Sequence, residues 1–231
     1  MKPLFVTATG TEIGKSFVTA ALAWQLRQRN KNILALKPVL SGLADTSIGE
    51  SDTGLLASAQ GLPHTDATWD MLTPFRYLAP LAPSMAAALE GRTLDTEALI
   101  RFCRDSMAAH AGPLLIEGVG GAFVPLDDRM LVADWIKALD ADCLLVAGSY
   151  LGTISHTLAT FEALQNRGIR VRALLVSESE KSGNTPHPDL GATCDTLALH
   201  TGLETIALPR LTGMDAFKLA PDLTHLILSA G

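Results

Sequence analysis

A short segment near the N-terminus has the residue types and spacing of a phosphate-binding loop. Residues 8–16 read ATGTEIGKS and lie between an apolar run and a stretch with helical periodicity. They match the pattern G-x-x-x-x-G-K-[ST], except that Thr9 stands where the first glycine belongs. In such a loop backbone N–H groups surround phosphate oxygens, Lys15 reaches the β- and γ-phosphates, and Ser16 offers a hydroxyl to Mg²⁺. We therefore predict a nucleotide phosphate site rather than a plain strand-to-helix turn.

Two charged residues come directly after other apolar runs. Glu117 ends the run 114–116 and precedes Gly118, which is where phosphate-loop enzymes hold their metal ion. A purely structural acid at this point would need a buried partner, so we favour the metal ligand. Lys37 follows the run 33–36 and could neutralise a carboxylate, a carbamate or a phosphate. A solvated lysine before a proline turn is the alternative.

Two expected helix starts also carry groups of interest. Residues 51–53 (SDT) begin a helix expected over 53–60, and an N-cap in this segment is a strong alternative to a metal role for Asp52. Residues 152–155 read GTIS and begin another helix, whose free N–H groups could bind a carboxylate. An ordinary Thr or Ser cap explains the same residues equally well.

Apolar runs alternate with helical stretches along the chain, and they must position these groups. We expect a looser, proline-rich region after residue 63 and a polar stretch over 177–189. We expect strands at 4–7, 33–36, 114–116, 143–147, 171–176 and 205–208. We expect helices at 15–30, 53–60, 96–111 and 131–139, and one that begins at 154 and stops at 167–168. A last helix follows the polar stretch and ends at about residue 200.

This alternation predicts the fold class. Continuous apolar strands between amphipathic helices are typical of a mostly parallel sheet that is covered on both faces. The expected fold is α/β: a single doubly wound, mostly parallel sheet with helices on both faces, forming one domain over residues 1–231. Ligands of such sheets bind beyond the carboxyl ends of the strands, where the residues above lie.

Composition excludes several classes of protein. The chain has 231 residues, 48% of them hydrophobic, and a formal net charge of −6, which argues against a nucleic-acid binder or an anionic-membrane binder. Three scattered cysteines are too few for a disulfide scaffold. No apolar run approaches the roughly 18 residues that a membrane span needs. We expect a cytoplasmic protein with no nucleic-acid partner and no membrane partner.

An ordered set of segments extends from the first strand to about Val176. The segments are 9–16 (TGTEIGKS), 37–42 (KPVLSG), 51–52 (SD), 90–92 (EGR), 117–121 (EGVGG), 124–126 (VPL), 133–135 (ADW) and 151–156 (LGTISH). Together they resemble the dethiobiotin synthetase family of P-loop ligases.

The resemblance implies an ATP- and Mg²⁺-dependent enzyme of biotin biosynthesis. Its substrate, 7,8-diaminononanoate, would take up CO₂ or bicarbonate carbon as a carbamate on one amine. The carbamate oxygen would attack the γ-phosphate, and the second amine would displace phosphate from the mixed carbamic–phosphoric anhydride to close the cyclic urea. Such enzymes are homodimers with the substrate at the subunit interface.

The resemblance also implies roles for individual residues. The catalytic residues would be Lys37, Lys15, Thr11 and Ser41. The nucleotide would contact Glu12, Ile13, Gly14, Lys15, Ser16, Phe17, Ser177 and Pro209. The metal ligands would be Ser16, Asp52 and Glu117. The substrate would contact Ser41, Gly118, Gly152, Thr153, Ile154 and Ser155, the last four being supplied by the second subunit to receive the distal carboxylate.

Four positions depart from the family pattern. Ala8 stands for the usual glycine, Ser84 for a histidine, Ser155 for an asparagine, and Ser177 for the asparagine that reads adenine. These changes leave the phosphate and metal chemistry in place, and they bear on base selectivity and on the substrate pocket. Two alternative functions are a ParA/MinD-like switch ATPase, which would want a second loop lysine, and a nucleotide-binding paralogue with an altered substrate.

Overall fold

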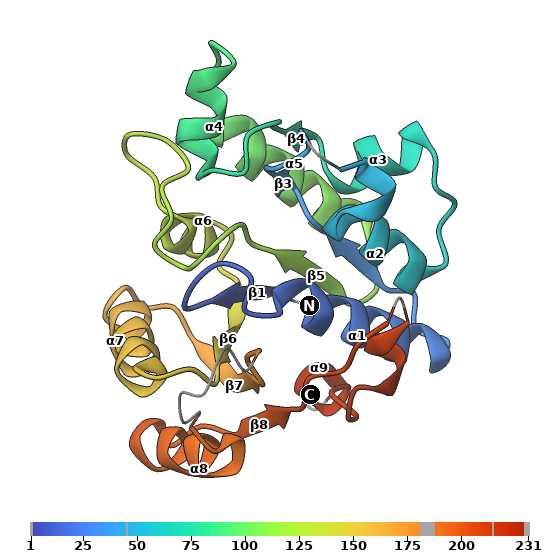
Figure 1. Cartoon of the computed structure of the whole chain (residues 1–231). Helices are drawn as coiled ribbons and strands as arrows, with labels where there is room; N and C mark the ends of the chain where they lie inside the picture. The colour runs from blue at the N-terminus through green and yellow to red at the C-terminus, as the bar shows by residue number, and fades with distance from the viewer. Residues whose placement is uncertain (1, 45, 181–187, 214, 229–231) are drawn as a thin grey trace.

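The computed structural model describes residues 2–44, 46–180, 188–213 and 215–228 (Figure 1). Its centre is a six-stranded sheet in the order β2-β5-β1-β6-β7-β8, and every neighbouring pair in it is parallel. The six expected strands are confirmed to within about one residue at each end. They are β1 (Leu4–Ala8), β2 (Leu34–Leu36), β5 (Leu114–Glu117), β6 (Asp142–Gly148), β7 (Val171–Ser177) and β8 (Thr205–Leu208).

Helices cover both faces of this sheet, as the sequence predicts for a doubly wound fold (Figure 1). One face packs against α1 (Lys15–Gln28), α2 (Asp52–Gln60), the 3₁₀ turn η2 (Ala216–Leu219) and the short α9 (His225–Leu228). The other face packs against α5 (Thr96–Ala109), α6 (Val132–Ala138), α7 (Thr153–Asn166) and α8 (Leu190–Thr201).

The strands are apolar throughout because both of their sides are buried. In β1, Phe5 packs edge-on against Trp135 with ring centroids 4.8 Å apart. Its neighbour Val6 points to the opposite core, which contains Leu22 and Leu26 of α1. The two faces thus take alternate residues of one continuous apolar run, which is the arrangement expected for a buried parallel sheet.

The proline-rich region is more ordered than the sequence indicates, so the expectation of a loose region is wrong. It holds most of a small layer beside β2, in which Trp69 and Leu72 are buried against Leu36. The start of the helix in this region is capped by a local hydrogen bond, in which Thr65 Oγ1 accepts the Thr68 N–H at 3.3 Å. The elements of this layer are β3 (Val39–Leu40), η1 (Ile48–Glu50), α3 (Asp66–Leu72), β4 (Phe75–Arg76) and α4 (Pro83–Leu89).

Three further sequence features concern membrane spans, cysteines and a polar stretch. Within the described residues, none of the helices combines the length and apolar character that a membrane crossing requires. All three cysteines are free and buried, and burial raises the pKa of the Cys103 and Cys143 thiols to about 12. The polar stretch expected at 177–189 lies partly outside the described residues, because 181–187 are not among them.

One close backbone contact sets the position of α2, which carries Asp52. A Cβ atom on Gly54 would overlap the backbone carbonyl of Gly49 in η1. We predict that Gly54→Ala destabilises the fold by about 1–3 kcal/mol, because η1 and α2 must separate. The measurement is urea unfolding. Gly191→Ala in α8 is the matched control, since its added Cβ would meet only the Asp189 carboxylate, at 3.3 Å. Equal stability of the two variants would contradict the prediction.

Candidate active site

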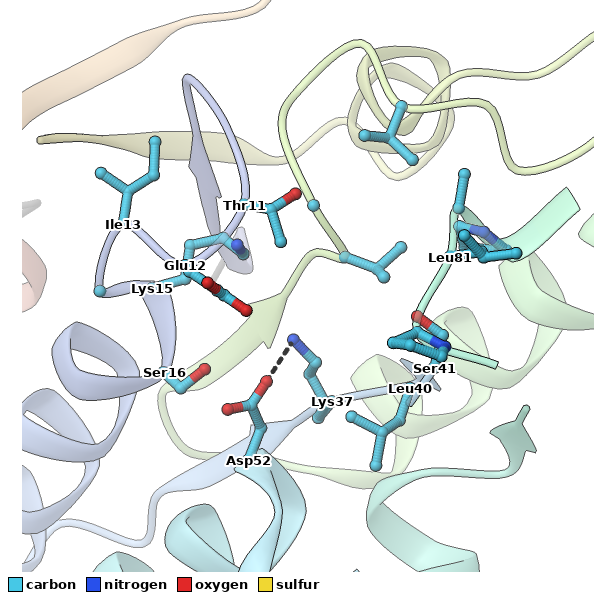
Figure 2. A pocket seen from close by; sticks show the side chains of 17 residues that line it. Thr11, Glu12, Ile13, Lys15, Ser16, Lys37, Leu40, Ser41, Asp52 and Leu81 are labelled. Atoms are coloured by element: carbon cyan, nitrogen blue, oxygen red, sulfur yellow. Dashed lines mark ion pairs between the residues drawn. The ribbon is translucent and has the colours of Figure 1, made fainter. Parts of the chain in front are cut away.

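A cavity of about 640 Å³ opens beyond the carboxyl ends of β1, β2 and β5 (Figure 2). This is the place that the topology of an open parallel sheet assigns to a ligand. The phosphate loop supplies one wall, and Lys37, Ser41 and Asp52 supply the opposite one. Residues that lie far apart in the sequence therefore share one space.

The loop after β1 is shaped for backbone contacts with an anion. Gly14 has φ 99° at the N-cap of α1 and makes no side-chain cap, so the first N–H groups of the helix stay available. Glu12 also has a positive φ, of 59°. The loop base is held by neighbours, since Thr9 N–H donates to Val146 O at 3.0 Å and Ala122 N–H donates to Ala8 O at 2.8 Å. A phosphate would therefore meet a preformed site.

Lys15 lies in this loop at the start of α1, and its side chain is buried. Burial, and next the nearby charge of Lys37, lower the pKa of Lys15 to about 8. Glu117 and Asp52 act in the opposite direction without cancelling these two effects. An anionic ligand would favour the charged form of Lys15, which suits a phosphate-binding group.

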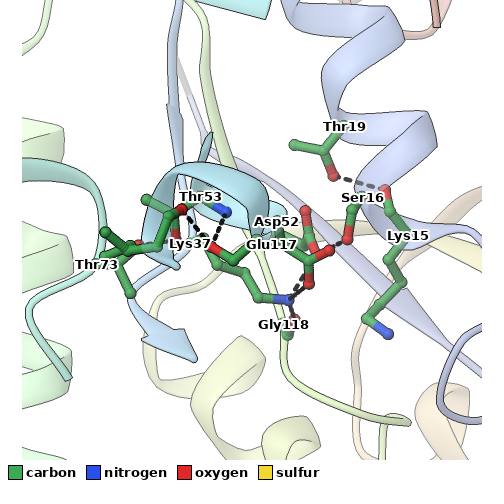
Figure 3. Close-up of polar contacts among 11 residues, drawn as sticks. Lys15, Ser16, Thr19, Lys37, Asp52, Thr53, Thr73, Glu117 and Gly118 are labelled. Atoms are coloured by element: carbon green, nitrogen blue, oxygen red, sulfur yellow. Dashed lines mark hydrogen bonds and ion pairs between the residues drawn. The ribbon is translucent and has the colours of Figure 1, made fainter. Parts of the chain in front are cut away.

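Lys37 forms a buried polar cluster with the predicted metal ligands (Figure 3). Its Nζ donates to Glu117 Oε1 at 2.6 Å and to Gly118 O at 2.9 Å, and it lies 3.2 Å from Asp52 Oδ2. Ser16 Oγ donates to the same Glu117 oxygen at 2.7 Å. The alternative of a solvated Lys37 is therefore wrong: its side chain is only 3% exposed, because the end of β2 lies under this cluster.

Charges in the cluster support one another. Burial alone would lower the pKa of Lys37, but Glu117 and Asp52 together raise it above its usual value. Burial alone would raise the pKa of Asp52, but the charge of Lys37 nevertheless holds that pKa below its usual range. Lysine and aspartate therefore both stay ionised at neutral pH.

Asp52 is placed by the start of α2 but does not cap it. Ser51 is the N-cap residue, and its Oγ accepts the Thr53 N–H at 3.2 Å. Thr53 in turn shares a buried hydrogen bond of 2.7 Å with Thr73. The N-cap expected in this segment is therefore Ser51, and the Asp52 carboxylate is left available to face Lys37 and the cavity.

The donors around Lys37 fit a divalent cation of the Mg²⁺ type. Ser16, Asp52 and Glu117 offer oxygen atoms only, which Mg²⁺ prefers. Glu117 Oε2 is buried without a hydrogen-bond partner, so one carboxylate lone pair is ready for a ligand. Among the described residues, no group of three or more His, Cys, Asp or Glu side chains is arranged so that it could hold a metal ion. Two carboxylates and a hydroxyl match a metal that also keeps water and phosphate ligands.

A second cavity, of about 520 Å³, continues from the other side of the phosphate loop. Six residues predicted to contact the nucleotide line it: Glu12, Ile13, Gly14, Phe17, Ser177 and Pro209. Sequence reasoning missed Glu178, Ser179, Glu180, Arg210, Leu211 and Thr212. These six follow β7 and β8, so the rule about carboxyl ends of strands would have found them.

Ser177 touches the phosphate loop directly. A Cβ on Gly14 would lie 3.0 Å from Ser177 Oγ, so the glycine leaves room for this serine. Its neighbour Ser179 is bound to the end of β6 by two reciprocal bonds, in which the Ser149 N–H donates to Ser179 Oγ at 3.0 Å and the Ser179 N–H donates to Ser149 Oγ at 2.9 Å.

The predicted substrate residues divide into two groups. Thr11 and Ser41 line the first cavity, and Gly118 offers its carbonyl to Lys37 at the cavity floor. Residues 152–155 line neither cavity. Gly152 is the N-cap of α7, and Leu151 beside it is 81% exposed. The sequence did not indicate the apolar wall, which comprises Leu40, Pro80, Leu81, Ala82, Pro83, Val119 and Val124.

Sequence comparisons find known proteins that are similar to this chain. A family model described as an AAA domain matches residues 2–216. The ATP-dependent dethiobiotin synthetase BioD of Methylobacterium nodulans is 43% identical, over 94% of this chain and 96% of its own. The protein of the same name from Caulobacter vibrioides is 42% identical, over 95% of this chain and 97% of its own.

Solved structures of low sequence identity share the fold. The MinC:MinD cell division protein complex of Aquifex aeolicus aligns with a TM-score of 0.57 at 12% identity, covering 95% of this chain and 86% of that one. A ParA family ATPase from Chlorobium tepidum aligns with a TM-score of 0.54 at 13% identity, covering 100% and 93%. Such low identity shows only that the fold is shared. The two relatives above match over nearly their full length at 42–43% identity, and the chain therefore belongs to the dethiobiotin synthetase family.

Proposed function

We propose that this chain forms dethiobiotin from 7,8-diaminononanoate, CO₂ and ATP as a ligase of biotin biosynthesis. The observation that carries the proposal is the convergence of Lys15, Lys37, Asp52 and Glu117 on one cavity that also has an apolar wall. A switch ATPase needs the charged groups but has no use for a wall that fits an aliphatic chain. The relatives' name, ATP-dependent dethiobiotin synthetase, points to the same reaction.

The nucleotide binds across the phosphate loop, with its base in the second cavity and its phosphates over Lys15. The free N–H groups at the start of α1 and the Lys15 ammonium neutralise the phosphate charge. Phosphoryl transfer asks mainly for positioning and charge stabilisation, which these groups provide without a nucleophilic side chain.

The carbamate forms on the substrate in the first cavity. The apolar wall from Leu40 and residues 80–83 holds the aliphatic chain, while Thr11 and Ser41 donate to carbamate or phosphoryl oxygens. The carbamate oxygen attacks the γ-phosphorus as the bond to ADP breaks, and the second amine then attacks the carbonyl carbon as phosphate leaves. Lys37 stabilises negative charge on the carbamate during the first of these steps.

Ser16, Asp52 and Glu117 hold Mg²⁺ in this proposal. The all-oxygen donors and the unpartnered Glu117 Oε2 support the assignment. When bound, the metal neutralises charge on the β- and γ-phosphates. Contacts with Lys37 hold the Asp52 and Glu117 carboxylates in position at the cavity.

The substrate's distal carboxylate binds the start of α7 of a second subunit, so the working form is a homodimer. Residues 152–155 line neither cavity of their own chain, which supports a role across an interface. Leu151 and Met85, at 81% and 57% exposure, offer apolar surface for such an interface. Free, buried cysteines are consistent with a cytoplasmic location for this one-domain chain.

Diamine-dependent turnover tests the proposed reaction. Purified chain supplied with Mg²⁺, ATP and bicarbonate should release phosphate only when 7,8-diaminononanoate is present. Lys37→Ala should lower kcat by about 100-fold or more, because charge on the carbamate is no longer stabilised. The measurement is phosphate release together with mass detection of dethiobiotin. Phosphate release that ignores the diamine would favour a switch ATPase or a paralogue with another substrate.

Complementation between two inactive variants tests the shared site. Lys37→Ala removes one half of a site, and Ser155→Arg fills the carboxylate end of α7 in the other half. Co-expression should restore about one quarter of wild-type sites, because half of the dimers are mixed and each mixed dimer has one intact site. Activity is assayed after purification as a dimer. A co-expressed sample that stays inactive would place residues 152–155 outside the site.

Proton uptake on nucleotide binding tests the role of Lys15. The free chain holds Lys15 with a pKa of about 8, and bound phosphates raise that pKa. Binding at pH 8 should therefore take up about half a proton, and binding at pH 6 almost none. Calorimetry in two buffers of different ionisation enthalpy measures the uptake. Lys15→Arg, which stays charged, is the control, and an undiminished uptake in that variant would assign the proton to another group.

A further inference from the structure

All three protons of the Lys37 ammonium are engaged by acceptors of the protein. An ammonium has three donors and no acceptor. Nζ donates to Glu117 Oε1 and Gly118 O, and Asp52 Oδ2 takes the third position at 3.2 Å (Figure 3). In this arrangement the group has no proton left for a substrate carbamate. Some event must therefore free Lys37 before it can act.

The two charged acceptors of Lys37 are also the carboxylates assigned to the metal. Glu117 is fully buried, and Asp52 lies at the cavity edge with its side chain 41% exposed. Leaving a buried carboxylate unpaired is strongly unfavourable. In the absence of a metal ion, Lys37 supplies the positive charge that keeps this pair stable.

We propose that Lys37 is a stand-in cation, which holds the Asp52–Glu117 pair in the metal-free chain and turns to the substrate when a divalent cation takes over these carboxylates. The inference rests on the proposed function, which assigns Mg²⁺ to them. According to this proposal, the Lys37 ammonium becomes free only after the metal ion has bound. A site that has bound the diamine without Mg²⁺ therefore stays unable to stabilise the carbamate.

Lys15 offers an internal comparison. It lines the same cavity and is also buried, yet no ion pair joins it to another described residue. A variant at Lys15 thus removes the same charge from the same space without vacating the carboxylate pair.

The experiment compares Lys37→Met and Lys15→Met without nucleotide, with Mg²⁺ alone as the probe. Thermal unfolding and calorimetric titration are the readouts. Lys37→Met should lose stability without Mg²⁺, regain it as Mg²⁺ is added, and bind Mg²⁺ at least tenfold more tightly than the wild type. Lys15→Met should bind Mg²⁺ with a much smaller gain. Equal gains in both variants, or no gain in Lys37→Met, would overturn the proposal.

Wild-type chain with ¹⁵N-labelled lysine supplies a second test that needs no variant. The ¹⁵Nζ signal of Lys37, assigned by its loss in Lys37→Arg, should shift when Mg²⁺ and a non-hydrolysable ATP analogue are added together. The analogue alone, with a chelator present, should leave the signal in place. An identical shift with and without Mg²⁺ would overturn the proposal. Diamine-dependent turnover of the wild type is unaffected by either result, so failure of this inference and failure of the proposed function are distinguishable.

Discussion

A lysine ammonium held between two carboxylates is the interaction on which the site depends. Lys37 is buried at 3% exposure, and Glu117 is fully buried 2.6 Å away. Neither charge is tolerable at this depth without the other. Their pairing fixes the ends of β2 and β5, and it brings Asp52 at the start of α2 into the same cluster. The geometry of the cavity floor follows from this electrostatic requirement.

The sheet order makes that pairing possible. β5 lies between β1 and β2, so the residues after three neighbouring strands emerge at one edge. Ser16 follows the loop after β1, Lys37 follows β2, and Glu117 ends β5. Because parallel strands share their direction, all three groups reach the same side of the sheet. Proteins such as MinD and ParA share this frame at 12–13% identity, which leaves the chemistry to the residues placed on it.

The segment between β2 and α5 supplies part of the cavity lining. Its small layer, with β3 paired to β4, carries Leu40, Ser41 and residues 80–83 to the cavity. The proline-rich part of this segment shows no long periodicity, because α3 and α4 have only seven residues each. Short elements of this kind are held by local caps and by contacts such as Trp69 on Leu36, which no pattern along the chain reveals.

Patterns along the chain are enough to predict the doubly wound sheet, the phosphate loop and the charged residues at strand ends. These features depend on local periodicity and on motif spacing, and each can be read within about 20 residues. The folded structure was needed to show that Lys37 is paired rather than solvated, that Ser51 is the residue that caps α2, and that an apolar wall closes the cavity. The pairing joins Lys37 and Glu117, which are 80 residues apart in the sequence and whose burial and distance exist only once the chain has folded.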